Sequence, residues 1–234
     1  MTVVAVRPRT QAELALWRLA FEVADLLEGI DWVVAGAQMV VILEHESGIR
    51  SGRTTGDIDA VVGGPEAVTA TRLAAERLRT AGFERSAEHP HRYERGGDQV
   101  DLLTIDHLRT KGLAARPEDL TPVPGGRRAL STRRHVHLEV AGLGEHRLPV
   151  PSLAGAIAMK IQAYGARQAV RDLEDVIRML ALVDDVEAVR AQLKPAERRR
   201  LGRMKGLWDP GAANWRVLPF PQDAQAAWAR LHDD

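Results

Sequence analysis

The 234-residue chain has no cysteine, no net charge and few aromatic residues. Without cysteine it has no disulfide framework, thiol nucleophile or cysteine-ligated zinc site. The balance of 32 basic and 32 acidic side chains excludes a bulk electrostatic attraction to nucleic acid or to anionic membranes. No run of 18 uncharged apolar residues occurs, and the first residues lack a basic flank followed by an apolar core. We therefore expect a cytoplasmic protein that does not contact a membrane.

Apolar residues make up 45% of the chain and charged residues 27%, the balance of a globular protein with a buried core. At roughly 150 residues per domain, the length predicts one large domain or one domain with an appended part. The chain has no internal repeat and no low-complexity segment. Its organisation must therefore be inferred from the spacing of its apolar residues.

Helix-type and strand-type spacing alternate along the first 150 residues. Strands are expected at 32–35, 57–62, 83–86, 91–95, 99–105, 136–140 and 147–150, and helices at 11–27, 37–43 and 65–80. Residues 107–132 are rich in Pro, Gly and Arg and are expected to form a loop. Pro149 has no N–H group, which restricts the last of these strands to a sheet edge.

Beyond Pro151 the spacing is helical throughout. The expected helices span 153–167, 170–182, 186–193, 195–205 and 222–231. This order predicts an α+β fold, with a mixed, mostly antiparallel sheet and flanking helices in residues 1–150 and a C-terminal helical part in residues 151–234.

Three carboxylates lie on two of the expected strands. Asp57 and Asp59 are two residues apart, so both side chains project from one face of their strand. Like charges on an apolar strand repel each other and are costly to bury, and a divalent cation with oxygen ligands is the simplest compensation. Asp101 lies between apolar residues of a later strand, where it needs either a cation or access to water.

Two features near the acidic pair indicate phosphate binding. Gly36 and Ala37 connect a strand directly to a helix, whose first N–H groups can bind a phosphate. Arg53 and Thr55 precede the acidic pair and offer a bidentate phosphate ligand and a hydroxyl. An ordinary turn or an exposed loop explains each feature singly, but their joint order favours a site for a metal and a nucleotide.

Cationic and aromatic side chains recur along one expected helix at intervals of four, three and four residues: Lys160, Tyr164, Arg167 and Arg171. This spacing gives one helix face if the helix is unbroken. A cationic face opposite a carboxylate cluster suits a nucleoside triphosphate, whereas the alternative for Lys160 is snorkelling to solvent. We expect Asp172 and Asp175 to form structural salt bridges with neighbouring arginines.

Together these motifs resemble the polymerase-beta-type nucleotidyltransferase superfamily. Its Gly-[Gly/Ser] turn, D-x-D strand and third acidic residue correspond to Gly36-Ala37, Asp57-x-Asp59 and Asp101. The stretch from Lys160 to Asp175 is similar to the helical motif of the AbiEii and MenT-like toxin branch, and the resemblance covers about residues 30–182. Many members have Ser or Gly where this chain has Ala37, which implies weaker triphosphate binding. Arg171 replaces the usual lysine before Asp172.

The resemblance implies a nucleotidyltransferase-like fold and two-metal transfer of a nucleoside monophosphate from an NTP to an acceptor hydroxyl. Asp57, Asp59 and Asp101 would hold Mg²⁺ or Mn²⁺, and Asp101 would also help to deprotonate the acceptor. The C-terminal part would complete the active-site cleft. Nucleotide and phosphate binding is assigned by the same resemblance to Gly36, Ala37, Arg53, Thr55, Lys160, Arg167 and Arg171.

The acceptor is assigned by resemblance alone. The toxin relatives modify tRNA 3′ ends, which implies tRNA as the acceptor and a cognate antitoxin protein as a further partner. Residues 190–205 carry seven basic side chains and one acidic one, a pattern that fits RNA binding and a solvated helix face equally well. The alternatives are an antibiotic-type nucleotidyltransferase with a small-molecule acceptor, or a non-catalytic member of the fold that binds a nucleotide or a protein.

Overall fold

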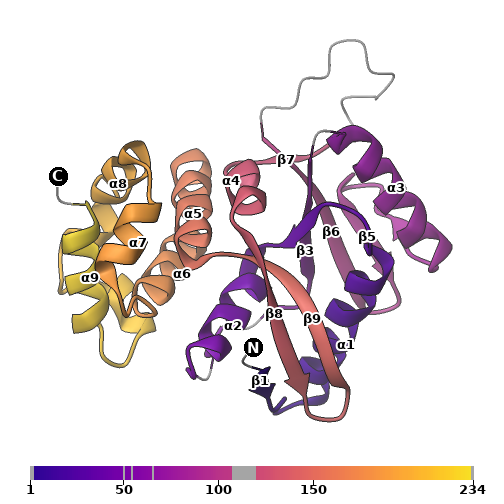
Figure 1. The fold of residues 1–234 in the computed structure, drawn as a ribbon, viewed down its shortest axis with the longest axis horizontal. Coiled ribbons are helices and arrows are strands. Elements are labelled where there is room, and N and C mark those ends of the chain that lie inside the picture. The colour runs from indigo at the N-terminus through magenta and orange to yellow at the C-terminus, as the bar shows by residue number, and fades with distance from the viewer. Residues whose placement is uncertain (1–2, 50, 54, 65, 107–119, 233–234) are drawn as a thin grey trace.

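The computed structural model describes residues 3–49, 51–53, 55–64, 66–106 and 120–232 (Figure 1). Its strands are β1 Val3–Val6, β2 Trp32–Val34, β3 Ile58–Val62, β4 Glu84–Arg85, β5 Arg92–Arg95, β6 Asp98–Ile105, β7 Pro122–Val123, β8 Arg133–Val140 and β9 Gly144–Pro151. The helices among them are α1 Gln11–Leu26, α2 Gly36–Glu46, α3 Ala67–Thr80 and α4 Gly126–Ser131. The α+β class is confirmed, with mostly antiparallel sheets and flanking helices.

From Leu153 onwards the described chain contains helices only, as the spacing predicts. They are α5 Leu153–Arg167, α6 Val170–Leu180, α7 Val186–Gln192, α8 Pro195–Gly202, the short 3₁₀ helices η2 Lys205–Leu207 and η3 Ala213–Val217, and α9 Gln222–His232. Helix α5 begins where expected, because the Ser152 hydroxyl accepts a hydrogen bond from the Gly155 N–H at 3.2 Å. None of the described helices is long and apolar enough to cross a membrane.

The described strands form two sheets. The larger has the order β2-β3-β6-β5-β4, with β7 against β6, and the smaller has the order β1-β8-β9. The central strands of the larger sheet, β3 and β6, are parallel and pair Asp59 directly with Asp101. Strands β2 and β5 flank them in the antiparallel sense. This register brings carboxylates from distant parts of the sequence side by side on one face.

The two faces of the central strands differ in chemistry. Alternate residues such as Ile58 and Val100 point into the main apolar core. On the opposite face, Val61 and Ile105 belong to a smaller cluster that Ala129 of α4 and Met159 of α5 help to form. The acidic residues occupy the other end of this second face, so the face changes from apolar to charged along the strands.

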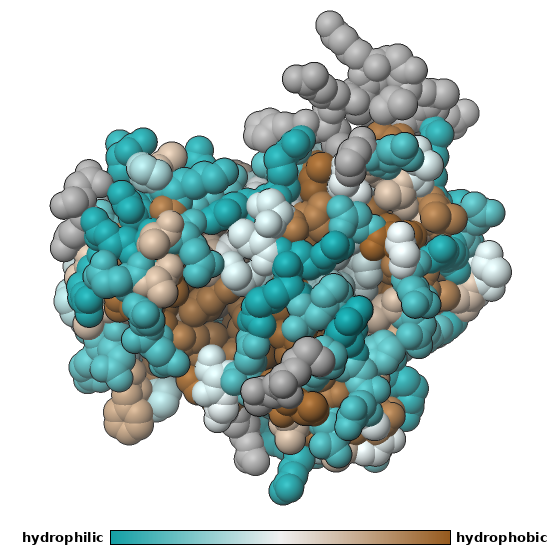
Figure 2. Space-filling view, in the orientation of Figure 1, coloured by the Kyte–Doolittle hydropathy of each residue, from teal (hydrophilic) through white to brown (hydrophobic). Residues whose placement is uncertain are grey.

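The C-terminal helices and the strands share one main core, to which Trp17, Leu138 and Ile177 all contribute as fully buried side chains. Figure 1 shows α5 and α6 between the strands and the more distant helices α7 to α9. Figure 2 shows mostly hydrophilic side chains on this side of the molecule, with apolar ones in the hollow between the strands and the C-terminal helices. The change in the spacing of apolar residues at Pro151 is therefore a change of secondary structure within a continuous core.

Three local expectations need correction. Strand β1 was not expected, since four residues give too short an alternation to recognise, yet it pairs in parallel with β8. The segment expected as loop contains β7 and α4, while residues 107–119 lie outside the described part. The helix carrying Lys160 ends at Arg167, because Gln168 adopts the left-handed conformation with φ 51°. Arg171 therefore belongs to a separate helix, α6.

The expectation for Pro149 is confirmed. Strand β9 is at the edge of the three-stranded sheet, where it pairs only with β8 among the described strands. Pro149 lies opposite His135 in this pairing. A residue without an N–H group is tolerated there because no further strand needs that donor.

Candidate active site

Asp59 lies on β3 against the first turn of α2. The Ala35 N–H donates to the Asp59 carbonyl oxygen at 2.8 Å, which fixes the start of α2 to β3. Gly36 has φ +60°, and a Cβ atom there would lie 1.6 Å from Asp59 Oδ2. The Asp59 carboxylate therefore packs directly on the glycine backbone. Because no side chain caps α2, its first N–H groups remain available beside this carboxylate.

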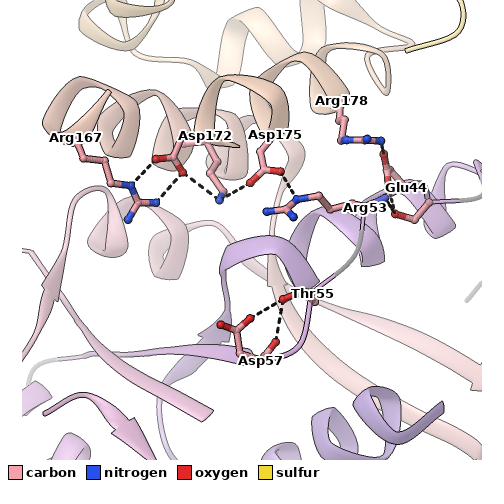
Figure 3. A network of polar contacts seen from close by, with 10 residues as sticks. Glu44, Arg53, Thr55, Asp57, Arg167, Asp172, Asp175 and Arg178 are labelled. Atoms are coloured by element: carbon pink, nitrogen blue, oxygen red, sulfur yellow. Dashed lines mark hydrogen bonds and ion pairs between the residues drawn. The ribbon is translucent and has the colours of Figure 1, made fainter. Parts of the chain in front are cut away.

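Asp57, immediately before β3, is fixed by two hydrogen bonds. The Thr55 hydroxyl donates to Asp57 Oδ1 at 2.5 Å, and the Gln99 amide donates to Oδ2 at 3.2 Å. Gln99 lies two residues before Asp101 on β6, on the same face. Figure 3 shows Thr55 and Asp57 facing a row of ion pairs that belongs mainly to α5 and α6.

The carboxyl group of Asp59 has a strongly raised pKa. Burial, together with the negative charges of Asp57 and Asp101, raises its pKa to about 7, although Lys160 and Arg167 lower it in part. The ionised form of Asp59 is thus disfavoured by burial first and by the two neighbouring carboxylates second, and a bound cation would offset both effects.

Asp101 is only 7% exposed and is held by its neighbours on β5. Arg92 lies opposite Asp101 in the β5–β6 register and donates from Nε and Nη2 to its two oxygens at 2.9 and 3.0 Å. His91 Nε2 is 3.7 Å from Asp101 Oδ2. Hydrogen bonding to Asp101 raises the pKa of Arg92, so the guanidinium stays charged. Both oxygens of the third carboxylate are therefore already engaged.

The opposite side of the site carries one buried cation, Lys160, and two more accessible ones, Arg53 and Arg167. Lys160 of α5 is 5% exposed, and its Nζ lies 2.7 Å from Asp175 Oδ2 and 3.4 Å from Asp172 Oδ1. Arg167 donates to both oxygens of Asp172 at 2.5 and 2.7 Å. Arg53, which precedes β3, donates from Nε to Asp175 Oδ1 at 2.9 Å (Figure 3). Lys160 thus does not snorkel to solvent but bridges two acids of α6.

These contacts refine the expected salt bridges. Burial alone would raise the pKa of Asp172, but hydrogen bonding to Arg167 and the charge of Lys160 bring it below its ordinary value. Asp172 pairs with Arg167 as expected, whereas Asp175 pairs with Lys160 and Arg53. Arg178 instead contacts Glu44 of α2 at 3.3 Å, and the Ser51 hydroxyl donates to the same carboxylate.

A cleft of about 660 Å³ lies between the carboxylates and the cations. It is lined by every residue assigned to the site by resemblance except Asp101: Gly36, Ala37, Arg53, Thr55, Asp57, Asp59, Lys160, Arg167 and Arg171. Arg171 is exposed and makes no ion pair with the described residues. Within the described part of the chain, no three acidic or histidine side chains are close enough together to hold a metal ion. The cleft therefore unites nine predicted residues without a preformed three-ligand cage.

Sequence reasoning missed the groups that hold the three carboxylates in place. Gln99 could have been found, since its position two residues before Asp101 places both on one strand face. Arg92 gave no such signal, because its contact depends on the register between β5 and β6.

Comparison with protein-family models and with curated proteins finds no match for the chain.

The contact between Gly36 and Asp59 predicts a position-specific loss of stability. Gly36→Ala is expected to cost at least about 2 kcal/mol, since it combines a positive φ with a clash against the Asp59 carboxylate. Gly29→Ala is the matched control, because Gly29 has φ +76° with no atom near its Cβ position, and should cost only about 1 kcal/mol. Urea denaturation measures both, and equal losses would contradict the close approach.

The raised pKa of Asp59 predicts that replacing this side chain by a neutral one stabilises the fold at high pH. Because the folded-state pKa of about 7 exceeds the ordinary 3.8, ionisation destabilises the fold as pH rises through this interval. Asp59→Asn should raise the free energy of unfolding by roughly 1–3 kcal/mol at pH 8 and by little at pH 4. Denaturation in EDTA measures this, with the exposed Glu94→Gln variant as the control for removing a negative charge. No gain at pH 8 would show that Asp59 is not destabilised by ionisation.

Proposed function

We propose that the chain is a metal-dependent nucleotidyltransferase, which moves a nucleoside monophosphate from an NTP to an acceptor hydroxyl. The observation that supports this most directly is that one cleft places two carboxylates opposite a wall of basic side chains, which are themselves paired with Asp172 and Asp175. Asp57 and Asp59 form one wall, while Arg53, Lys160 and Arg167 form the other. A triphosphate with divalent cations matches this arrangement, since the cations meet the carboxylates and the phosphates meet the basic side chains.

The residues around Asp57 and Asp59 fit Mg²⁺ or Mn²⁺. Both supply carboxylate oxygens to the cleft, and burial together with the neighbouring carboxylates disfavours the ionised form of Asp59, an effect that a bound cation would offset. A bound divalent cation would stabilise the charge that develops when the acceptor oxygen displaces pyrophosphate at the α-phosphorus. Asp57 is held ready for ligation, because Thr55 and Gln99 fix the orientation of its carboxylate.

The chain's own groups would position the triphosphate. The uncapped N-terminus of α2 offers backbone N–H donors at Gly36 and Ala37, which bind phosphate without a hydroxyl at position 37. Arg171 is the cleft cation most available to a ligand, because it has no ion pair with the described residues. Lys160 is instead fixed between Asp172 and Asp175, so it contributes a positioned charge.

Asp101 needs a rearrangement before it can act. Both of its oxygens accept hydrogen bonds from Arg92, so taking a proton from the acceptor or ligating a metal requires that guanidinium to move at least in part. This contact favours the second candidate function, a non-catalytic member of the fold that binds a nucleotide through the cleft. The enzyme is the stronger proposal, because Asp57 and Asp59 face the cleft and no cation among the described residues forms an ion pair with either.

A tRNA 3′ end is the acceptor we propose, with the protein acting as the toxin of a toxin–antitoxin system and a cognate antitoxin as its partner. The motif resemblance supports this acceptor, and so do the exposed basic residues Arg200 and Arg203 in and after α8. A small-molecule acceptor of the antibiotic type remains the alternative for the same cleft.

Label transfer tests the proposal. With α-labelled NTPs and Mg²⁺ or Mn²⁺, the protein should label tRNA, and Asp57→Asn or Asp59→Asn should reduce the rate at least about 100-fold. Glu145→Gln, which alters an exposed carboxylate on β9 of the smaller sheet, should leave the rate unchanged. Label on an aminoglycoside instead of tRNA would favour the small-molecule acceptor. Metal-dependent thermal stabilisation by NTP without any transfer would favour the non-catalytic function.

A further inference from the structure

A second pocket of about 580 Å³ lies beside the cleft, between α5, α8 and β7. Ile161 and Met204 line it as buried apolar side chains, at 2% and 3% exposure, and Pro122 and Pro124 add further apolar surface. A volume of this size accommodates a small organic ligand. None of the residues assigned to the nucleotide or metal site lines this pocket.

The cations at this pocket differ from those in the cleft. Arg200 and Arg203 line it and are exposed, and their side chains make no hydrogen bond or ion pair with the described residues. Asp106 is the one carboxylate among the described lining residues, and it accepts a hydrogen bond from the Arg127 backbone N–H at 2.9 Å. The guanidinium groups thus retain their full capacity for an anion, whereas Lys160 and Arg167 in the cleft are already paired with acids.

An aromatic ring and an open helix surface complete the pocket. Tyr164 of α5 is half-buried, and its hydroxyl makes no hydrogen bond with the described residues. One residue further, Gly165 is exposed to the pocket, and a Cβ atom there would meet nothing within 4 Å. Glycine inside a helix costs about 1 kcal/mol relative to alanine. Here it leaves the wall beside Tyr164 free of side chain, so a flat ring can approach.

The pocket and the cleft adjoin at one turn. Gln168, the left-handed residue that ends α5, lines the pocket, while Arg167 and Ala169 on either side of it line the cleft. Helix α5 therefore presents Lys160 and Arg167 to the cleft and Ile161 and Tyr164 to the pocket. A ligand in the pocket would lie next to one in the cleft.

We propose that this pocket binds one nucleotide unit, with its base against Tyr164 and the apolar floor and its phosphate on Arg200 and Arg203. Aromatic stacking and arginine–phosphate contacts are the interactions that recognise a base joined to an anion. A free nucleotide and the end of a strand share this chemistry. The role of the pocket as the acceptor site rests on the proposed function, but binding to it requires no turnover.

Binding in EDTA tests this pocket separately from the metal-dependent cleft. Nucleoside monophosphates and a short oligoribonucleotide are titrated by calorimetry, and nucleosides without phosphate should bind at least about tenfold more weakly. Tighter binding of the monophosphate identifies a free nucleotide as the ligand, and tighter binding of the oligonucleotide identifies a strand end. Equal affinity for nucleosides and monophosphates would overturn the proposed role of the two arginines.

Two variants address the site itself. Gly165→Phe fills the pocket from an open helix surface. The double variant Arg200→Ala/Arg203→Ala removes the anion-binding groups. Each variant should weaken binding at least about tenfold, while the thermal midpoint stays close to that of the parent. Arg199→Ala is the matched control, an exposed arginine on the same helix that does not line the pocket, and should bind like the parent. Unchanged binding by Gly165→Phe, or an equal loss with Arg199→Ala, would overturn the inference.

Asp59→Asn separates this inference from the proposed function. The variant should retain binding in EDTA, because Asp59 lines the cleft and not the pocket. Retained binding together with an absence of label transfer by the parent protein would uphold the pocket and refute the transferase. Lost binding in Asp59→Asn would place the ligand in the cleft and overturn the inference.

Discussion

The parallel register of β3 and β6 is the constraint on which the site depends. It places Asp59 beside Asp101, and the residue two positions earlier, Asp57, on the same face, so three like charges must be accommodated together. The protein does so unevenly. Arg92 neutralises Asp101, and hydrogen bonds orient Asp57, but Asp59 has only the more distant attraction of Lys160 and Arg167. The remaining repulsion acts mainly on the Asp59 carboxylate, at the N-terminus of α2.

A second set of charges connects the two parts of the chain. Asp175 of α6 binds both Lys160 of α5 and Arg53 from the segment before β3, while Glu44 of α2 contacts Arg178. Buried ion pairs gain little net stability, because desolvation offsets most of their attraction. They do specify geometry, since a displaced helix would leave a buried charge without its partner. The cationic wall is therefore held in register with the carboxylate wall.

Local spacing was enough to predict most of the elements and the residues of the cleft. The alternation around Asp57 and Asp59, the glycine at the start of α2 and the start of α5 each depend on neighbours within a few residues. What the sequence could not reveal depends on longer distances or on rare backbone conformations. Asp175 meets Arg53 across 122 positions, and the left-handed Gln168 ends α5 at a residue that is not glycine. The role of Asp101 stays a prediction for the same reason, because a cross-strand arginine decides its availability.

The cleft and the neighbouring pocket differ in how far their cations are already paired with acids, and this difference implies different requirements for a ligand. In the cleft, acids already pair with Arg53, Lys160 and Arg167, and Asp57 and Asp59 would repel an incoming triphosphate, so anion binding there would need a divalent cation to offset the carboxylates. In the neighbouring pocket, the side chains of Arg200 and Arg203 have no ion pair with the described residues and would attract an anion directly. Under the proposed function, binding of the nucleotide depends on metal whereas binding of the acceptor does not. The left-handed turn at Gln168 separates the two electrostatic environments while keeping the ligands adjacent.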